Sequence, residues 1–433
     1  MLLQAKSALN RFFMNQQASS ISKDYLSAQE AVLLLGVRMQ TLYAYVSRGW
    51  IHSIAQSGRK DRLYARADIE KLKARSLARS GHGAVAASAM HWGEPIIPTT
   101  ITQITSEGPL YRGQLATQLA RSHVSFEEVA ELLWNGTLAT VSVRWPRYVQ
   151  TDSLRKFATS IVVPTANDQL MELFSIFTMW LGLSRGYAAG HLDSQDTLAV
   201  ARELIQTLTG CFGYASQRRT FYQLRKGQSI AEGLLGALEV EETTANLEGL
   251  NAALVVLADH ELSPSSFAAR IAASSGATLH SCLAAAVCTN SGAQIGRLYS
   301  EVERFLTRGA SSKTLFRRAS ELQARGLAVP GFGHPLYPRG DPRARLLLDL
   351  IRKREGRSKS LDAVERFVAD SQDRLGLYPR QELALGLLGI AMGLPKNTSG
   401  ALFTLARTAG WVAHVREQRL AGTFLRPRAK FVG

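Results

Sequence analysis

The chain has 433 residues, 46% of them hydrophobic, which predicts a folded protein of two or more domains because one core rarely exceeds about 250–300 residues. The formal charge of +16 indicates an anionic partner, either a nucleic acid or an anionic metabolite. The longest nearly unbroken apolar run, Leu383–Leu394, is shorter than the roughly 18 residues of a membrane span, so we expect no membrane segment.

The cysteines and short motifs narrow the class of protein further. Cys211, Cys282 and Cys288 lack CxxC spacing and leave one cysteine over, which favours a reducing cytoplasm over a disulfide framework. HExxH and GxxxxGK[ST] strings do not occur, so zinc proteolysis and Walker-type phosphate binding have no support. We therefore expect a cytoplasmic protein without a metal site.

Positive charge is concentrated near the N-terminus. Residues 1–80 hold 13 Lys and Arg against 5 Asp and Glu, which is half of the excess in the whole chain. This segregation indicates a basic module joined to a more balanced body. We expect an N-terminal arm at 1–23 and the folded module at 24–73.

The module is predicted to contain two short helices and a hairpin. Ser27 and Glu30 have the S-x-x-E spacing of a capping box, and Gly36 ends the first helix. A second helix follows, and the stretch Ile51–Tyr64, apolar at its ends and basic between them, predicts a two-stranded wing.

This pattern resembles the winged helix-turn-helix domains of the MerR and excisionase type. The resemblance implies DNA binding through the second helix and the basic wing, although an ordinary solvated charged surface is the alternative for any basic patch. The residues expected at the DNA are Gln40, Thr41, Tyr43, Arg48, Arg59, Lys60 and Arg62.

Residues 74–92, rich in Ala, Ser and Gly, are predicted to form a linker, and the body at 93–433 is predicted to be almost entirely α-helical. Ser125 and Glu128 form another capping-box pattern. Long apolar-periodic segments follow at 166–190, 194–210, 229–239, 245–258, 265–290, 344–353, 361–374, 380–393 and 397–417.

The body resembles the citrate synthase family over residues 100–433. The strings that carry the resemblance occur in the family's order: LYRG at 110–113, SFEEVAELLWNG at 125–136, LADHELSPSSFAARIAASSGA at 257–277, GFGHPLYPRGDPRAR at 331–345, LARTAGWVAH at 405–414 and LRPR at 425–428. The resemblance implies a mainly α fold with a large and a small helical domain. It also implies condensation of acetyl-CoA with oxaloacetate to give citrate and CoA, with the acyl-CoA as co-substrate and no cofactor.

The family's site residues carry over where the strings match. Arg343 and Arg407 match the arginines that clamp the oxaloacetate carboxylates, because a guanidinium fork suits a carboxylate. His334 matches the histidine that polarises the ketone, and His260 matches a further oxaloacetate ligand. Arg426 matches an arginine that the neighbouring subunit supplies, which implies a homodimer.

Two positions depart from the family's pattern. Ile295 stands where the family has its enol-stabilising histidine, and Gly296-Arg297 stands where it has Gly-Gly, which we expect to crowd a thioester. Glu382 stands in place of the aspartate base, and it is either a displaced base or an ordinary helix-surface residue. His280 lies near Ile295 in sequence but is a poor substitute.

Three functions therefore stay open. The chain is either a citrate or methylcitrate synthase of reduced or lost activity, or a DNA-binding regulator that senses a carboxylate. A third possibility is a subunit that completes the site of a catalytically intact paralogue in a hetero-oligomer.

Overall fold

The computed structural model describes residues 25–47, 50–55, 62–66, 68–70, 72, 97–148, 151–161, 169–185, 194–307, 311–354 and 359–427. The chain divides into two compact units, one of Met1–Ile96 with Pro427–Gly433 and the other of Ile97–Arg426. The expected arm at 1–23 and the linker at 74–92 lie outside the described residues.

The N-terminal unit contains the two short helices that the sequence predicts. Helix α2 (Ala28–Leu35) begins with the reciprocal capping box of Ser27 and Glu30. It ends at Gly36, whose φ of 65° lies in the left-handed region that glycine adopts at no steric cost. Helix α3 (Met39–Ser47) follows after two residues.

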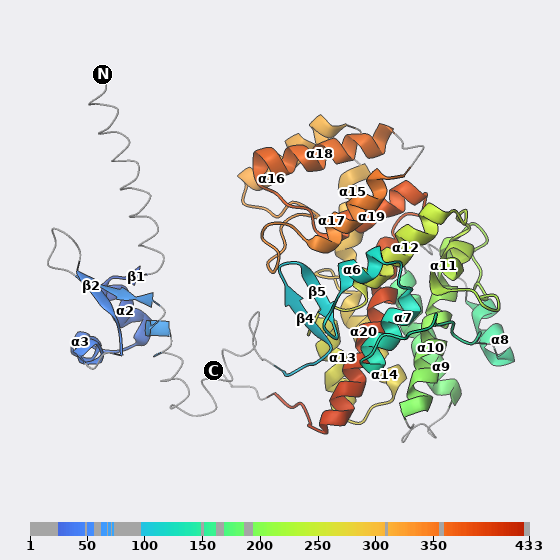
Figure 1. The fold of residues 1–433 in the computed structure, drawn as a ribbon, viewed down its shortest axis with the longest axis horizontal. Helices are drawn as coiled ribbons and strands as arrows, with labels where there is room; N and C mark the ends of the chain where they lie inside the picture. The colour runs from blue at the N-terminus through green and yellow to red at the C-terminus, as the bar shows by residue number, and fades with distance from the viewer. Residues whose placement is uncertain are drawn as a thin grey trace. The chain divides into compact units, whose positions relative to one another are not determined.

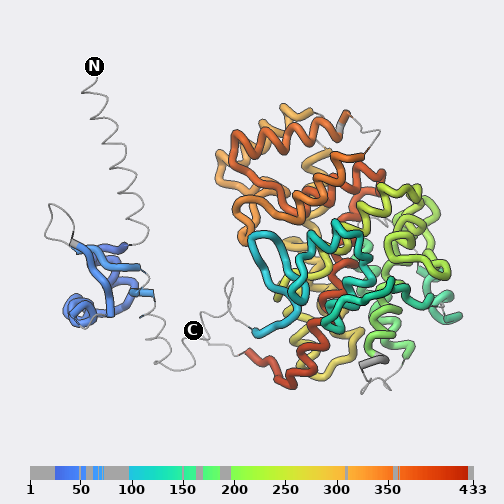
Figure 2. Tube along the Cα trace, viewed as in Figure 1, coloured from blue at the N-terminus to red at the C-terminus, as the bar shows by residue number. Residues whose placement is uncertain are grey.

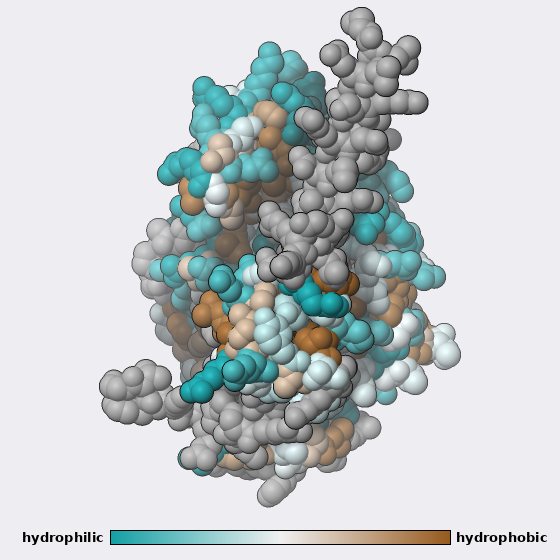
Figure 3. Space-filling model, turned by 90° about the vertical axis from the view of Figure 1, so that its left-hand side faces the viewer, coloured by the Kyte–Doolittle hydropathy of each residue, from teal (hydrophilic) through white to brown (hydrophobic). Residues whose placement is uncertain are grey.

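The same unit contains a three-stranded antiparallel sheet in the order β1 (Tyr25–Leu26), β3 (Arg62–Ala65), β2 (Ser53–Ala55). The pairing of β2 with β3 confirms the predicted hairpin, whereas β1 is too short to show the alternation that predicts a strand. The near face of this unit in Figure 3 mixes hydrophilic residues with a few apolar ones. Its small core consists of Leu26, Ala31, Leu42, Ile51, Tyr64 and Ile69.

The second unit opens with a small antiparallel sheet and is otherwise helical (Figure 1). The sheet, which the sequence analysis did not predict, pairs β4 (Thr102–Thr105), β5 (Gly108–Tyr111) and β6 (Gln114–Leu115) in that order. The first helices are α6 (Ala116–Arg121), α7 (Phe126–Asn135), α8 (Asp152–Ser160), α9 (Leu170–Arg185) and α10 (Ser194–Cys211), followed by the 3-10 turn η3 (Phe212–Ala215).

The remaining helices form the rest of this unit. They are α11 (Ile230–Leu238), α12 (Thr244–Leu257), α13 (Pro264–Ser274), α14 (Leu279–Asn290), α15 (Arg297–Thr307), α16 (Ser312–Ala324), α17 (Pro342–Arg352), α18 (Lys359–Leu375), α19 (Gln381–Met392) and α20 (Ser399–Ala421). Among the described residues, no helix is both long and apolar enough to span a bilayer.

Helix α20 is the central element of this unit (Figures 1 and 2). Every residue from Ser399 to Val415 is buried, because α7, α10, α12, α13 and α14 pack around the helix. Helices α13 and α14 pair, and α14 also packs on α9. Helices α15 to α19 form the orange region at one end in Figure 1, where α16 packs on α18 and α17 on α19.

The helices differ in places from the apolar-periodic segments of the sequence. The segment 265–290 is divided into α13 and α14, because Gly276 has a φ of 80° and Thr278 caps a new helix. Helices α8, α15 and α16 lie outside those segments, although α15 is strongly amphipathic, with Tyr299, Val302 and Phe305 buried on one face.

Candidate anion-binding site

Four of the predicted site residues come together from distant segments. His260 follows α12, His334 lies in the loop between α16 and α17, Arg343 lies in the first turn of α17, and Arg407 lies at the middle of α20. The rings of His260 and His334 are 5.7 Å apart between centroids, and the charges of both arginines act on His260. The structure therefore assembles a cationic cluster, which we call the arginine–histidine site.

Arg343 is fully buried and is held by the aspartate that begins its own helix. Asp341 caps α17, and its carboxylate accepts hydrogen bonds from Arg343 Nε at 3.0 Å and Nη2 at 2.8 Å. Burial opposes both charges, yet Asp341 raises the pKa of Arg343 and Arg343 lowers the pKa of Asp341. The third nitrogen, Nη1, is buried without a hydrogen-bond partner among the described residues.

Arg407 is also buried, but no carboxylate among the described residues pairs with it directly. Its Cζ lies 4.9 Å from the ring centroid of Phe403, and its Nε and Nη1 have no hydrogen-bond partner in the described part of the chain. Burial lowers the pKa of Arg407, and the nearby Asp259 carboxylate offsets part of that effect. A buried polar group without a partner costs roughly 1–3 kcal/mol, and guanidinium nitrogens in this situation are the donors that an anionic ligand would satisfy.

His334 is a neutral hydrogen-bond donor in this site. Burial, followed by the charge of Arg343, lowers the pKa of His334 to about 4, so the ring is uncharged at neutral pH. Its Nδ1 accepts a hydrogen bond from the backbone N–H of Leu336 at 3.1 Å. The proton of the neutral ring therefore resides on Nε2, which can donate to a ligand oxygen.

Tyr337 connects the two histidines. Its hydroxyl lies 3.1 Å from His260 Nε2, and its ring lies 4.8 Å from that of His334. The guanidinium of Arg343 lies 5.5 Å from the centroid of the same ring. Burial, and then the charge of Arg343, lower the pKa of His260, so this ring too is neutral at neutral pH.

Glu382 is buried in the first turn of α19 and is engaged by a neighbour. Arg380 donates to its two carboxylate oxygens, from Nη2 at 2.7 Å and from Nε at 3.1 Å. Of the two alternatives for Glu382, the ordinary helix-surface residue is therefore wrong. In this arrangement each carboxylate oxygen accepts one hydrogen bond from Arg380.

Ile295 lies in the turn between α14 and α15 and packs partly buried against the core. The next residue, Gly296, has no space for a side chain, because an added Cβ would lie 2.4 Å from the Asn290 carbonyl oxygen. Arg297 is mostly exposed and is directed toward Glu172 of α9, at 3.8 Å. Its side chain therefore runs along the surface in this structure.

His280 does not belong to the arginine–histidine site. His280 is buried on α14 and packs against Gly182 of α9 so closely that a Cβ added at Gly182 would lie 2.9 Å from the Cβ of His280. Burial, and then the charge of Arg185, lower its pKa to about 4. Its surroundings thus explain it as a neutral core histidine.

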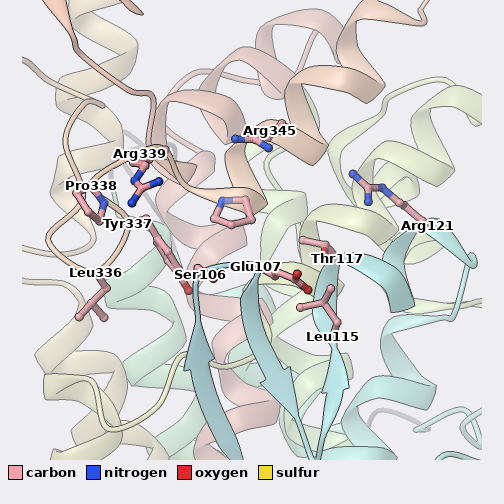
Figure 4. A pocket seen from close by; sticks show the side chains of 12 residues that line it. Ser106, Glu107, Leu115, Thr117, Arg121, Leu336, Tyr337, Pro338, Arg339 and Arg345 are labelled. Atoms are coloured by element: carbon pink, nitrogen blue, oxygen red, sulfur yellow. The ribbon is translucent and has the colours of Figure 1, made fainter.

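An open pocket of about 610 Å³ lies beside the site, between the tip of the β4–β5 hairpin and the loop that carries Tyr337 (Figure 4). Arg339, Arg345 and Arg121 line it together with Glu107. Because Tyr337 also contacts His260, the pocket adjoins the arginine–histidine site.

The other predicted residues are spread more widely. Arg426 is exposed in the segment after α20 and makes no ion pair or hydrogen bond with a described residue. Gln40 and Tyr43 are exposed on α3 and Thr41 is half-buried, whereas Arg62 donates to Ser53 across the hairpin. Arg48, Arg59 and Lys60 lie outside the described residues. No group of three or more His, Cys, Asp or Glu side chains suited to a metal ion occurs in the described ranges.

Several members of the arginine–histidine site were missed from the sequence. Asp259, Tyr337 and Asp341 each adjoin a predicted residue in the same string, and that adjacency was an available signal. Arg380 stands two residues before the predicted Glu382 and carries the same signal, whereas Tyr299 belongs to another segment and carries none. Its role becomes visible only through packing.

Comparisons with a family model, with curated proteins and with solved structures all match this chain to citrate synthases. The family model described as "Citrate synthase, C-terminal domain" matches residues 90–428. The chain is 27% identical to the citrate synthase of Haloferax volcanii over 342 residues, which cover 75% of this chain and 89% of that protein. It is 31% identical to the putative citrate synthase 2 of Mycobacterium bovis over 354 residues, covering 75% and 86%. The crystal structure of citrate synthase from Thermotoga maritima superposes with a TM-score of 0.66 at 24% identity, covering 79% of this chain and 94% of that one.

Proposed function

The chain belongs to the citrate synthase family, and from its site we propose that it binds a dicarboxylate of the oxaloacetate class and condenses it slowly with an acyl-CoA such as acetyl-CoA. The observation that carries this proposal is the set of three buried guanidinium nitrogens without partners, Nη1 of Arg343 and Nε and Nη1 of Arg407. Two carboxylates of one small ligand would satisfy them.

The proposed ligand is oriented by charge and by one directed donor. Its carboxylates lie against Arg343 and Arg407, and its ketone oxygen accepts a hydrogen bond from Nε2–H of His334. This donor polarises the ketone carbon for attack and transfers its proton to the oxygen that becomes the hydroxyl of the product. His260, linked to Tyr337, lines the same space.

The acyl-CoA half of the reaction is the weaker half. A base has to remove a proton from the methyl carbon, and the resulting enolate forms the new carbon–carbon bond at the ketone; water then hydrolyses the thioester and releases CoA. Glu382 is the proposed base, and its pairing with Arg380 limits it. Ile295, at the position matched to the enol-stabilising histidine, donates no hydrogen bond to the enolate.

We propose that the protein acts as a homodimer. Ile176, Met179 and Leu183 are 49%, 48% and 79% exposed on one face of α9, at the spacing that places them side by side. A second copy covering this apolar face would account for it. The exposed Arg426 would then be available to the partner's site, and a catalytically intact paralogue could take the partner's place in a hetero-oligomer.

A second candidate function is a carboxylate-responsive DNA-binding regulator. The observation that favours it is the N-terminal unit, which contains the capped helix α2, the turn at Gly36, helix α3 and a hairpin. Gln40 and Tyr43 are exposed on α3. Duplex binding that weakens with added salt would support this function. Tyr43→Ala should reduce it, whereas Leu33→Ala, on the exposed side of α2, serves as the matched control; a full-length protein without duplex affinity would refute it.

Two titrations and one assay separate these functions. Calorimetry with oxaloacetate and then with acetyl-CoA measures binding, and a coupled thiol assay measures release of CoA. We expect oxaloacetate binding and slow CoA release. Oxaloacetate binding without acetyl-CoA binding or CoA release would assign the sensor, and no oxaloacetate binding would refute the proposed function.

A further inference from the structure

Tyr299 places a phenol beside the arginine–histidine site from a helix that contributes nothing else to it. It lies on α15, four residues after Ile295, and is fully buried. Its ring centroid is 5.0 Å from that of Phe403, the same ring that Arg407 covers at 4.9 Å. The charges of Glu382, Arg407 and Arg343 all act on its hydroxyl.

The hydroxyl has no hydrogen-bond acceptor among the described residues as they are placed. Tyr299 Oη accepts a hydrogen bond from Gln381 Nε2 at 3.4 Å, and Gln381 Oε1 is also buried without a partner. Burial raises the pKa of Tyr299, so the phenol keeps its hydrogen at neutral pH. A buried donor without an acceptor is unfavourable, as are the unpaired guanidinium nitrogens of Arg343 and Arg407, and the same ligand can satisfy both.

We propose that the Tyr299 hydroxyl donates a hydrogen bond to a carboxylate oxygen of the ligand that Arg343 and Arg407 hold. This rests on the proposed function to the extent that the ligand is a dicarboxylate, and it holds for the synthase and for the sensor alike. Tyr299 is then a third, uncharged donor in the site, directed from the α15 side. It is a ligand-binding residue and takes no part in proton transfer.

The test is calorimetric titration of oxaloacetate into the full-length chain and its Tyr299→Phe variant, which removes only the oxygen atom. We expect the Kd to rise about ten- to hundredfold, the loss typical of a hydrogen bond to a charged acceptor. Tyr214→Phe is the matched control, because that buried hydroxyl donates to the Ala158 carbonyl at 2.7 Å and interacts with no residue of the site. The Kd of the control should stay within about twofold, the range expected for a distant, independent residue.

The outcomes separate this inference from the proposed function. If Tyr299→Phe binds oxaloacetate as tightly as the unaltered chain while Arg407→Met does not bind it, the inference is wrong and the proposed function stands. If the unaltered chain binds no oxaloacetate, both are wrong. Should Tyr299→Phe fail to fold, Gln381→Met provides the second test: it removes the group that holds the phenol oxygen and should raise the Kd severalfold, and an unchanged Kd would overturn the inference.

Discussion

The two buried arginines should respond oppositely to removal of their charge in the ligand-free protein. Arg407→Met removes two unpaired buried nitrogens, each unfavourable by roughly 1–3 kcal/mol. It also removes the contact with Phe403, about 1–2 kcal/mol, and the attraction to Asp259. Burial lowers the pKa of Arg407, which means that the folded state disfavours its charge. The expected change in the free energy of unfolding lies between zero and a gain of about 2 kcal/mol.

Arg343→Met has the opposite sign. The Asp341 side chain is fully buried and pairs with Arg343 through both carboxylate oxygens. Removing the guanidinium leaves this carboxylate buried without its counter-charge, a loss of about 3–5 kcal/mol. The free energies of unfolding of the two variants, each with one arginine of the site replaced by methionine, are therefore expected to differ by about 3 kcal/mol or more.

Urea unfolding at neutral pH, with and without oxaloacetate, measures both effects. At a ligand concentration of about 100 times Kd the unaltered chain should gain about 2.7 kcal/mol, and neither variant should gain a measurable amount. If Arg407→Met destabilises the ligand-free chain as strongly as Arg343→Met, the nitrogens of Arg407 have partners in the free protein, and the reasoning that assigns them to a ligand is refuted.

Three further predictions concern neighbouring features. Folding lowers the pKa of His334 to about 4, so as the pH drops the unfolded chain takes up this proton before the folded chain does. The free energy of unfolding should therefore decrease from pH 6.5 toward pH 4. His334→Gln should flatten the curve of unfolding free energy against pH in that window. Ile295→His should raise CoA release by up to about a hundredfold if this position faces the thioester, and an unchanged rate would contradict the assignment. Leu183→Glu should convert the proposed dimer to a monomer in sedimentation, whereas Leu327→Glu, at another exposed apolar residue, should not. Equal sedimentation of the two variants would contradict an interface on α9.

The parts of the fold that were predictable are those with a local physical signal. The capping boxes at Ser27 and Ser125 specify helix starts through hydrogen bonds that close within four residues. The break at Gly276 was missed although the sequence carries a local signal for it, a glycine after two serines and before the cap residue Thr278. The hairpin β4–β6 was missed because strands of two to four residues are too short for alternation to be recognised.

The site was predictable in a different way. His260, His334, Arg343 and Arg407 were found through matching strings, and the structure brings them together. The contacts of Tyr299 depend instead on how α15 packs against α20 and α19, and no spacing in the sequence encodes that packing. Residues that act through tertiary contacts have no periodicity of their own, so the sequence alone does not reveal the arrangement around the arginines.

The position of the two arginines links ligand binding to the packing of the helices. Arg343 begins α17, which packs on α12 and α19, and Arg407 lies in α20, the centre of the unit. A dicarboxylate that satisfies both therefore connects these two helices, and its binding energy favours the arrangement in which they lie at the right separation. A condensing enzyme and a ligand-dependent regulator both need such a coupling. The residues that distinguish them are Glu382, held by Arg380, and Ile295, which cannot stabilise an enolate, so the rate of CoA release relative to oxaloacetate affinity decides between the two functions.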